Sequence, residues 1–335
     1  IRYVAIFGLI AIASTLWSPT PVYTAAGSFG FVASILFCCT AATKLTEQAI
    51  YRTVMISFAI YVALNLMSAI TIPDIAWLST FTDADAPRLQ GVSSHPNILG
   101  KEMAAFICLL LPLGLAYGKK RSTYFLVALA FAIIFATRSR TSLVAMVVTL
   151  SLPMLVRPQV LKPVALVGAA FIGAAVLAIS IGFVPNVQSL LDGASRSSDA
   201  SEILTLTGRT ELWGFVWSKI LEAPFLGHGF GAADAVLSRE WWGPPDASVG
   251  AHNTWLQSLL MLGVVGTIPF VTFHQVLIRR WFAQPTTLTR LLTPYLLIHG
   301  MTEVEIAAHP VMLTISTFLI MAIDARRNLR AAQST

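Results

Sequence analysis

Residues 251–275 read AHNTWLQSLLMLGVVGTIPFVTFHQ, and this stretch decides the fold. After the polar pair His252-Asn253, the segment continues for about 20 residues, the length of a membrane-spanning helix, without a single Asp, Glu, Lys or Arg. The stretch therefore predicts a membrane-spanning helix that begins where a polar loop ends.

Apolar runs of similar length recur along the 335 residues. The chain is 56% hydrophobic and 11% charged, whereas a soluble globular protein is about 25% charged. The sequence predicts an all-α, polytopic membrane helix bundle that forms a single integral membrane domain over 1–335. The chain opens inside an apolar run without a Met, so we expect further helices upstream. About ten spans are predicted: 3–17, 25–43, 53–72, 102–117, 123–137, 141–156, 163–183, 253–275, 289–304 and 309–324.

Positive charge is unevenly divided between the segments that join these spans. One side holds fourteen of the 22 Lys and Arg residues and only two acids, Glu47 and Asp324. The other side holds the remaining eight cations and fourteen acids. The positive-inside rule makes the first side cytoplasmic. We therefore expect a multi-pass protein of the bacterial inner membrane with both visible termini in the cytoplasm, and we attribute the net charge of +6 to this asymmetry rather than to nucleic-acid binding.

The long polar segment 184–252 falls on the outer, periplasmic side and is far longer than a simple connection. Within it, residues 211–221 have the apolar spacing of an amphipathic helix. The glycine-rich segment 227–231 predicts a flexible turn. The pair Trp241-Trp242 suits an interfacial or sugar-facing loop, because indole rings have an apolar body and a polar edge. We expect this partly helical loop to carry part of the active site.

Three arginines on the outer side are candidates for binding a diphosphate. Arg138 and Arg140 lie between two apolar spans with no acid in the turn, and Arg209 follows a glycine and precedes the predicted helix. Guanidinium groups pair with phosphate through two hydrogen bonds, and a helix start adds backbone N–H donors. The alternatives are snorkelling to lipid headgroups for the first two, and a local pair with Glu211 for Arg209.

His252 is the candidate catalytic base. A helix N-terminus and nearby arginines disfavour imidazolium, so we expect a neutral ring that can accept a proton at neutral pH. The alternative is an ordinary boundary residue. The neighbouring Asn253, and Glu211 in the outer loop, are candidates for binding the acceptor or orienting the base. Gly263 and Gly266 lie three residues apart, and we expect them to let another helix approach closely.

Polar residues at the ends of two other spans are weaker candidates. Arg88, His95 and Asn97 precede the fourth span and could bind phosphate or sugar, although an ordinary loop-to-helix turn explains them equally well. Glu303 and Glu305 lie at the outer end of the ninth span. Acids at membrane depth are commonly functional, so either could orient the base or bind an acceptor hydroxyl.

No motif for a metal or cofactor stands out. Asp83-Ala84-Asp85 has the spacing of a metal-binding acid pair, but it lies in the outer loop 73–101, where nucleotide sugars are absent. Cys38, Cys39 and Cys108 all lie within spans, which argues against disulfides and Cys-based metal sites. We expect no cofactor and no metal.

Several of these motifs, taken together and in order, resemble the superfamily of O-antigen ligases and polymerases. The resemblance rests on His-Asn, nine residues and Gly-x-x-Gly at 252–266, on the Ser-Arg-Thr turn at 139–141, and on segments 16–19, 88–100, 208–213 and 227–231. It implies a GT-C-like bundle of about twelve helices and an inverting, metal-independent glycosyltransferase at the periplasmic face.

The resemblance also implies the substrates. The donor would be an undecaprenyl-diphosphate-linked glycan, with His252 as base and Arg138, Arg140 and Arg209 on the leaving diphosphate. A ligase would use lipid A core as acceptor, and a polymerase would use another carrier-linked repeat. The spacing after His252 favours the ligase, whereas the run 205–213 is more typical of polymerases. A lipid-linked glycan transporter or flippase is a further alternative, although the charges cluster at one face rather than at mid-membrane.

Overall fold

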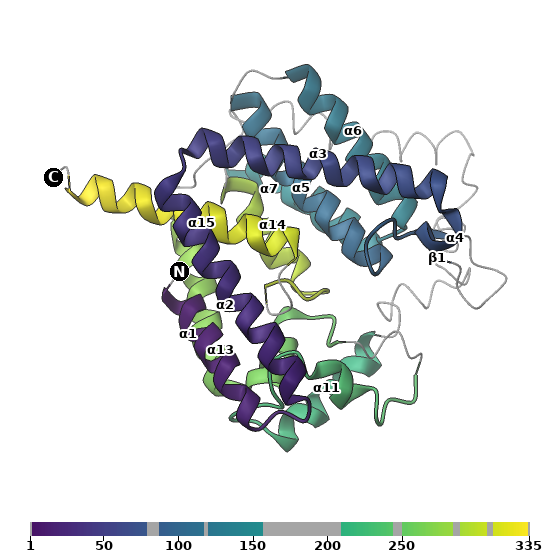
Figure 1. Cartoon of the computed structure of the whole chain (residues 1–335), viewed down its shortest axis with the longest axis vertical. Coiled ribbons are helices and arrows are strands. Elements are labelled where there is room, and N and C mark those ends of the chain that lie inside the picture. The colour runs from purple at the N-terminus through teal and green to yellow at the C-terminus, as the bar shows by residue number, and fades with distance from the viewer. Residues whose placement is uncertain are drawn as a thin grey trace. The chain divides into compact units, whose positions relative to one another are not determined.

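The computed structural model describes residues 2–78, 87–116, 120–156, 209–243, 250–283, 289–306 and 311–333 (Figure 1). Helices dominate these residues, so the predicted all-α class is confirmed. The helices are α1 (Arg2–Ala13), η1 (Ser14–Leu16), α2 (Pro21–Lys44), α3 (Glu47–Thr71), α4 (Pro73–Ala76), α5 (Pro96–Ala116), α6 (Lys120–Thr137), α7 (Arg140–Val156), α11 (Arg209–Glu222), α12 (Ala233–Leu237), α13 (Thr254–Ala283), α14 (Thr289–His299) and α15 (Met312–Gln333). Two short strands, β1 (Trp77–Leu78) and β2 (Arg88–Leu89), pair antiparallel.

Five helices are long and apolar enough to cross a membrane: α2, α3, α5, α6 and α13. The segments Arg2–Leu16 and Arg140–Leu152 are apolar but shorter. Each predicted span coincides with or overlaps a helix, except 163–183, which lies outside the described residues. Some boundaries differ. The span predicted to reach residue 304 ends at His299, because Gly300 turns the chain and its amide closes the last turn onto the carbonyl of Leu296 (3.0 Å). Helices α13 and α15 continue past the predicted ends at 275 and 324.

The chain divides into two compact units. The first comprises residues 1–61, 109–126 and 212–335, and the second comprises 62–108 and 127–211. In the first unit, α1 packs against both α2 and α13, and α15 packs against α2 (Figure 1). Phenylalanines fill the space between these helices: the ring of Phe7 lies 5.0 Å from Phe270 and 5.6 Å from Phe31, and Phe31 lies 5.5 Å from Phe318.

The second unit is organised around the turn that follows β2. Asn65, fully buried in α3, accepts a hydrogen bond from the amide of Val92 (3.0 Å) through its side-chain oxygen. The neighbouring Gly91 has φ +60°, and a Cβ there would lie 1.9 Å from the same oxygen. Only glycine tolerates this approach in a left-handed conformation. The contact fixes the β2 turn onto α3.

A break in α13 positions the loop that carries the glycine-rich turn. At Gly263 the backbone leaves helical geometry (φ 57°, ψ −163°), and segment 224–229 enters the gap. Broken helices at membrane depth need such partners, because lipid offers the freed backbone groups none. Four backbone hydrogen bonds of 2.8–3.1 Å join them: amides 264 and 265 donate to carbonyls 224 and 225, and amides 228 and 229 donate to carbonyls 260 and 261.

This arrangement corrects two predictions. The close neighbour of Gly263 is the backbone of loop residues 225 and 226, not another helix. The glycine-rich turn 227–231, predicted to be flexible, is held by the hydrogen bonds of amides 228 and 229. A Cβ added to Gly227 would lie 2.4 Å from the backbone of Met261. Glycine is required here for close approach between a loop and a broken helix.

Gly263→Ala is therefore expected to lower the thermal unfolding temperature of the detergent-purified protein. The new Cβ would lie 2.3 Å from the carbonyl of Phe225, and this backbone conformation, which is essentially limited to glycine, alone costs another residue about 1–3 kcal/mol. Gly214→Ala is the matched control, because nothing lies within 4 Å of an added Cβ in α11. It should be neutral or slightly stabilising. Equal unfolding temperatures for both variants would show that the break does not depend on Gly263.

Candidate active site

His252 lies immediately outside the start of α13, in the first unit, and its backbone is unusual. Its φ is +44°, and Arg138 is the only other residue in the described ranges that has a positive φ and is not glycine. Its ring is partly exposed, and Nδ1 lies 3.1 Å from Oε2 of Glu303. Left-handed backbone at a residue with a Cβ costs free energy and is concentrated at functional sites. The turn therefore presents a histidine already paired with a carboxylate.

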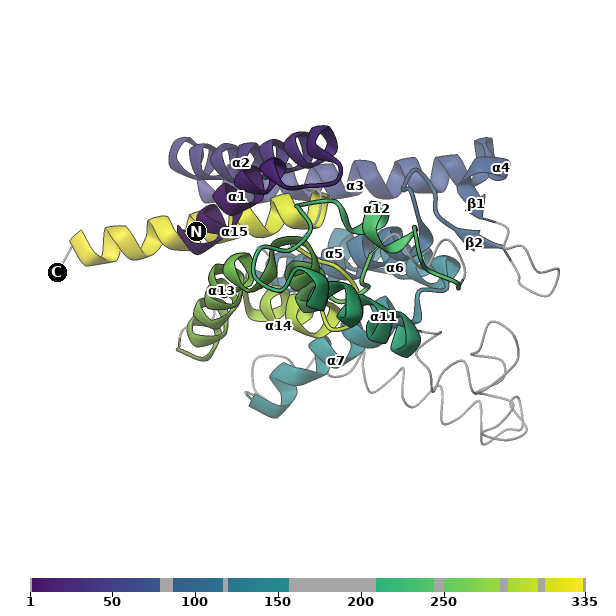
Figure 2. The ribbon, with the colours of Figure 1, turned by 90° about the horizontal axis from the view of Figure 1, so that it is seen from below.

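Asn253 caps α13 and anchors the neighbouring turn. Its side-chain oxygen accepts hydrogen bonds from the amides of Trp255 (2.9 Å) and Leu256 (3.1 Å), as an N-cap residue does. Its Nδ2 donates to the carbonyl of Met301 (2.9 Å). The amide of Thr254 donates to the carbonyl of Gly300 (2.8 Å). Asn253 thus holds the start of α13 against the turn after α14, helices that lie side by side in Figure 2.

The two acids at the end of α14 have different partners. Both are buried; Glu303 is paired with Nδ1 of His252, and Glu305 is paired with Nδ1 of His299. The ring of Tyr295 stacks on His299 with centroids 5.3 Å apart. The Thr254 hydroxyl connects the two, because it donates to the Glu303 carbonyl and accepts from the Glu305 amide, both at 2.9 Å. The structure therefore places Glu303 as the residue that can orient His252, and Glu305 one layer deeper.

Helix α11 supports the same turn from its other side. Trp213 Nε1 donates to the carbonyl of Ala251 (2.9 Å), so α11 fixes the residue that precedes His252. The predicted amphipathic helix is confirmed. Its apolar side packs on α12 and α13 through a cluster of buried apolar residues: Leu212, Val216, Ile220, Ala233, Leu237, Ala251 and Leu260.

An aromatic surface lies beside this cluster. The rings of Trp241 and Trp242 lie 4.8 Å apart, and Phe215 lies 5.4 Å from Trp242, which is largely exposed. Lys219 hydrogen-bonds Glu222 (2.8 Å) and Glu240 (2.6 Å), and these bonds, chiefly that with Glu222, raise the pKa of the Lys219 amine. The exposed ring of Trp242, supported by these neighbouring rings, can hold a sugar face.

In the second unit, the Ser-Arg-Thr turn sets its two arginines in different environments. Arg138 is exposed and has φ +51°, whereas Arg140 is half-buried as the first residue of α7. Ser139 between them is buried, and its hydroxyl hydrogen-bonds the Ser142 hydroxyl (2.9 Å). It packs tightly on Gly100, since a Cβ added to Gly100 would lie 2.7 Å from the Cβ of Ser139. The turn is therefore rigidly held while Arg138 points outward.

Arg88 is buried and bonded within the protein. Its Nε donates to the Thr137 carbonyl (3.0 Å) at the end of α6, and a terminal nitrogen donates to the side-chain oxygen of Asn97 (2.7 Å). His95 Nδ1 accepts from the Asn97 amide (3.1 Å). The structure brings these three predicted residues together beside the turn that bears Arg138. The arrangement favours a supporting role for Arg88, which holds that turn.

Arg209 is the first residue of α11 and is largely buried, while Glu211 in the first turn of that helix is exposed. Both belong to the second unit, as do Arg138 and Arg140, whereas His252 and Glu303 belong to the first. Asp83, Asp85 and the central part of loop 184–252 lie outside the described residues.

Two buried charges had not been predicted. Lys101 and Glu102 lie in α5 of the second unit, with exposed fractions of 8% and 2%. Their signal in the sequence was plain: two adjacent charges inside an apolar run, which is unusual at membrane depth. The His299–Glu305 pair was visible only as nearby residues. Among the described residues, no group of three or more His, Cys, Asp or Glu could hold a metal ion.

Comparison with known proteins relates part of the chain to a protein family. Residues 125–271, somewhat under half of the chain, match the family model described as O-antigen ligase. The match includes Arg138, Arg140, Arg209 and His252. No curated protein matches the chain. Together with the apolar helices, the match indicates a bacterial membrane protein.

Proposed function

We propose that the chain, whose residues 125–271 match the family model described as O-antigen ligase, transfers an undecaprenyl-diphosphate-linked glycan en bloc to an acceptor hydroxyl at the periplasmic face of the inner membrane. The observation that carries the proposal is the His252–Glu303 pair. His252 has strained backbone just before α13 and lies within the matched residues 125–271, whereas Glu303 lies beyond them.

The pair suits general-base catalysis. His252 takes the proton of the acceptor hydroxyl as its oxygen attacks the anomeric carbon, and the bond from that carbon to the diphosphate breaks with inversion. Glu303 holds the ring through Nδ1, which leaves Nε2 for the acceptor, and its negative charge stabilises the imidazolium as it forms. A carboxylate that orients a histidine in this way is a recurring arrangement on unrelated folds.

The leaving diphosphate needs positive charge rather than a proton donor. Arg138, Arg140 and Arg209 are the proposed ligands for it, and Arg88 with Asn97 and His95 supports the turn that bears Arg138. Stabilisation of developing negative charge by fixed donors is commonly the largest contribution to such catalysis. The aromatic surface formed by Phe215, Trp241 and Trp242 is the proposed contact for glycan, on the donor or the acceptor.

The acceptor distinguishes two versions of this function. We favour ligase-type transfer to lipid A core, since the family model that matches is described as O-antigen ligase; polymerisation onto a second carrier-linked repeat is the alternative. The test incubates the purified protein with carrier-linked glycan and each acceptor separately, and measures release of carrier diphosphate. Release with lipid A core alone supports the ligase, and release with carrier-linked repeat alone supports the polymerase. No release with either would overturn glycosyl transfer.

We further propose that transfer requires no metal and no cofactor. The same assay should keep its rate in EDTA, because arginines supply the charge that a divalent cation would otherwise provide. A rate lost in EDTA and restored by a divalent cation would contradict this mechanism.

The proposed orientation places α11 outside the cytoplasm and the α5–α6 connection inside it. A cysteine introduced at the exposed Thr210 should react with a membrane-impermeant maleimide added to cells whose outer membrane is permeable. A cysteine at the exposed Lys120 should not. The reverse pattern would invert the proposed topology and exclude a periplasmic site.

A further inference from the structure

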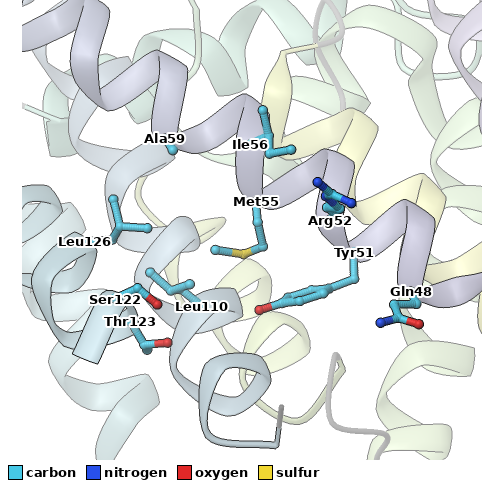
Figure 3. Close-up of a pocket in the computed structure, with 10 residues that line it drawn as sticks. All are labelled: Gln48, Tyr51, Arg52, Met55, Ile56, Ala59, Leu110, Ser122, Thr123 and Leu126. Atoms are coloured by element: carbon cyan, nitrogen blue, oxygen red, sulfur yellow. The ribbon is translucent and has the colours of Figure 1, made fainter. Parts of the chain in front are cut away.

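A cavity of about 670 Å³ lies in the first unit and is lined by none of the residues assigned above. It opens between α3 on one side and α5 with α6 on the other (Figure 3). Tyr51 and Met55 project from α3 toward Leu110 of α5 and Thr123 of α6. Thr123 is fixed there by a tight helix crossing, since a Cβ on Gly114 would lie 1.8 Å from its hydroxyl.

The lining of the cavity is polar at one end and apolar at the other. On α3, the polar residues Gln48, Tyr51 and Arg52 precede Met55 and Ala59; on α6, Ser122 and Thr123 precede Leu126. A helix rises 1.5 Å per residue, so on α3 the polar end of the cavity lies near the start of the helix and the apolar end lies farther along it. Ser122, Thr123 and Leu126 of α6 are grouped on the side of Ala59, away from Gln48 (Figure 3). For helices that cross a membrane, this order places polar groups at headgroup depth and apolar groups in the hydrocarbon.

The polar end carries a net positive charge. Arg52 is the only charged residue of the cavity lining, is exposed, and forms no hydrogen bond or ion pair with any residue in the described ranges. The nearest acid along the chain, Glu47, is engaged by α15: it receives two hydrogen bonds from Arg327, and Arg326 lies 4.0 Å away. Glu47 therefore does not neutralise Arg52.

We propose that this cavity binds an anionic phospholipid of the surrounding membrane. The lipid phosphate pairs with Arg52, with Gln48 beside it, and an acyl chain lies along Met55, Ala59 and Leu126. The volume is that of a small-ligand site, and the layering of charge and apolar surface matches that of the lipid. The ligand is a structural lipid, distinct from the glycan carrier, and its binding does not depend on glycosyl transfer.

Native mass spectrometry of the detergent-purified full chain tests the proposal. The protein is titrated with phosphatidylglycerol, with phosphatidylethanolamine and with glycerol 3-phosphate, which carries the phosphate without acyl chains. We expect retention of phosphatidylglycerol in preference to phosphatidylethanolamine, and none of glycerol 3-phosphate. Arg52→Gln should lower the affinity for phosphatidylglycerol about fivefold, the effect of one cation at a membrane surface.

Two further variants separate this site from general lipid adhesion. Arg280→Gln removes another exposed arginine, in α13 and outside the cavity, and should leave phosphatidylglycerol retention unchanged. Ala59→Leu narrows the apolar end and should weaken both lipids. Equal retention of the two lipids by the unaltered protein, or equal losses for Arg52→Gln and Arg280→Gln, would overturn the proposal. Binding of glycerol 3-phosphate alone would show a free-phosphate site instead.

Discussion

His252→Ala is expected to lower the single-turnover rate of glycan transfer by roughly 10²–10⁴, the usual contribution of a general base, while donor binding changes little. The His252 ring is partly exposed, whereas its partner Glu303 is buried in the turn after α14, so a matched unfolding temperature should accompany the rate. Rapid-quench measurements at saturating donor report the rate, and binding of labelled donor in nanodiscs reports the affinity.

The role of Glu303 is tested by Glu303→Gln, which keeps a group able to accept a hydrogen bond from Nδ1 but removes the negative charge. If the carboxylate stabilises the imidazolium, the rate should fall by at least about tenfold, and His252→Ala with Glu303→Gln together should be no worse than His252→Ala alone, because the two residues act as a unit. Asp234→Asn, an exposed acid in α12, is the matched control and should leave the rate unchanged. Additive losses in the double variant would contradict a shared role, and a near-normal rate for His252→Ala would exclude it as the base.

The helices could be predicted from the sequence because apolar length and composition are local properties. The helices found at the predicted apolar runs confirm this. Helix α11 confirms it as well, because the spacing of its apolar residues indicated which side is buried. The break at Gly263 could not be predicted, since a continuous apolar run is equally compatible with an unbroken helix. The break depends on residues 224–229, which are distant in sequence and whose backbone groups hydrogen-bond the backbone groups freed on both sides of Gly263.

The site shows the same division between local and distant information. His252 and Asn253 were recognisable from a local motif, and Asn253 proved to be the cap of α13. The partner of His252 is 51 residues away, and nothing in the spacing of Glu303 and Glu305 distinguishes the one that faces it. The turn after Gly300 determines which acid faces His252, because the Thr254 hydroxyl bonds the Glu303 carbonyl and the Glu305 amide and so fixes the backbone of both acids. Likewise, the sequence offered Arg88 as a phosphate ligand, but only the fold shows its bonds to Thr137 and Asn97.

The arginine variants are expected to fail in a different way from His252→Ala. If Arg138, Arg140 and Arg209 bind the diphosphate, replacing any one by alanine should weaken donor binding by roughly ten- to a hundredfold, since a hydrogen bond to a charged group is worth about 1.5–3 kcal/mol. Lysine should rescue poorly, because it lacks the planar pair of donors.

Arg138 gives the sharpest form of this test. It is exposed, so its loss should not disturb the fold, whereas Arg209 is largely buried and its variants need a matched unfolding temperature. Arg280→Gln again controls for general loss of charge. Donor affinity and single-turnover rate are measured for each arginine variant and for His252→Ala. A variant that has lost the base should bind donor but not react. A variant that has lost a diphosphate ligand should react slowly because it binds donor weakly. Normal donor affinity in all three arginine variants would place the diphosphate elsewhere on the protein, and loss of donor binding in His252→Ala would make that residue a ligand rather than a base.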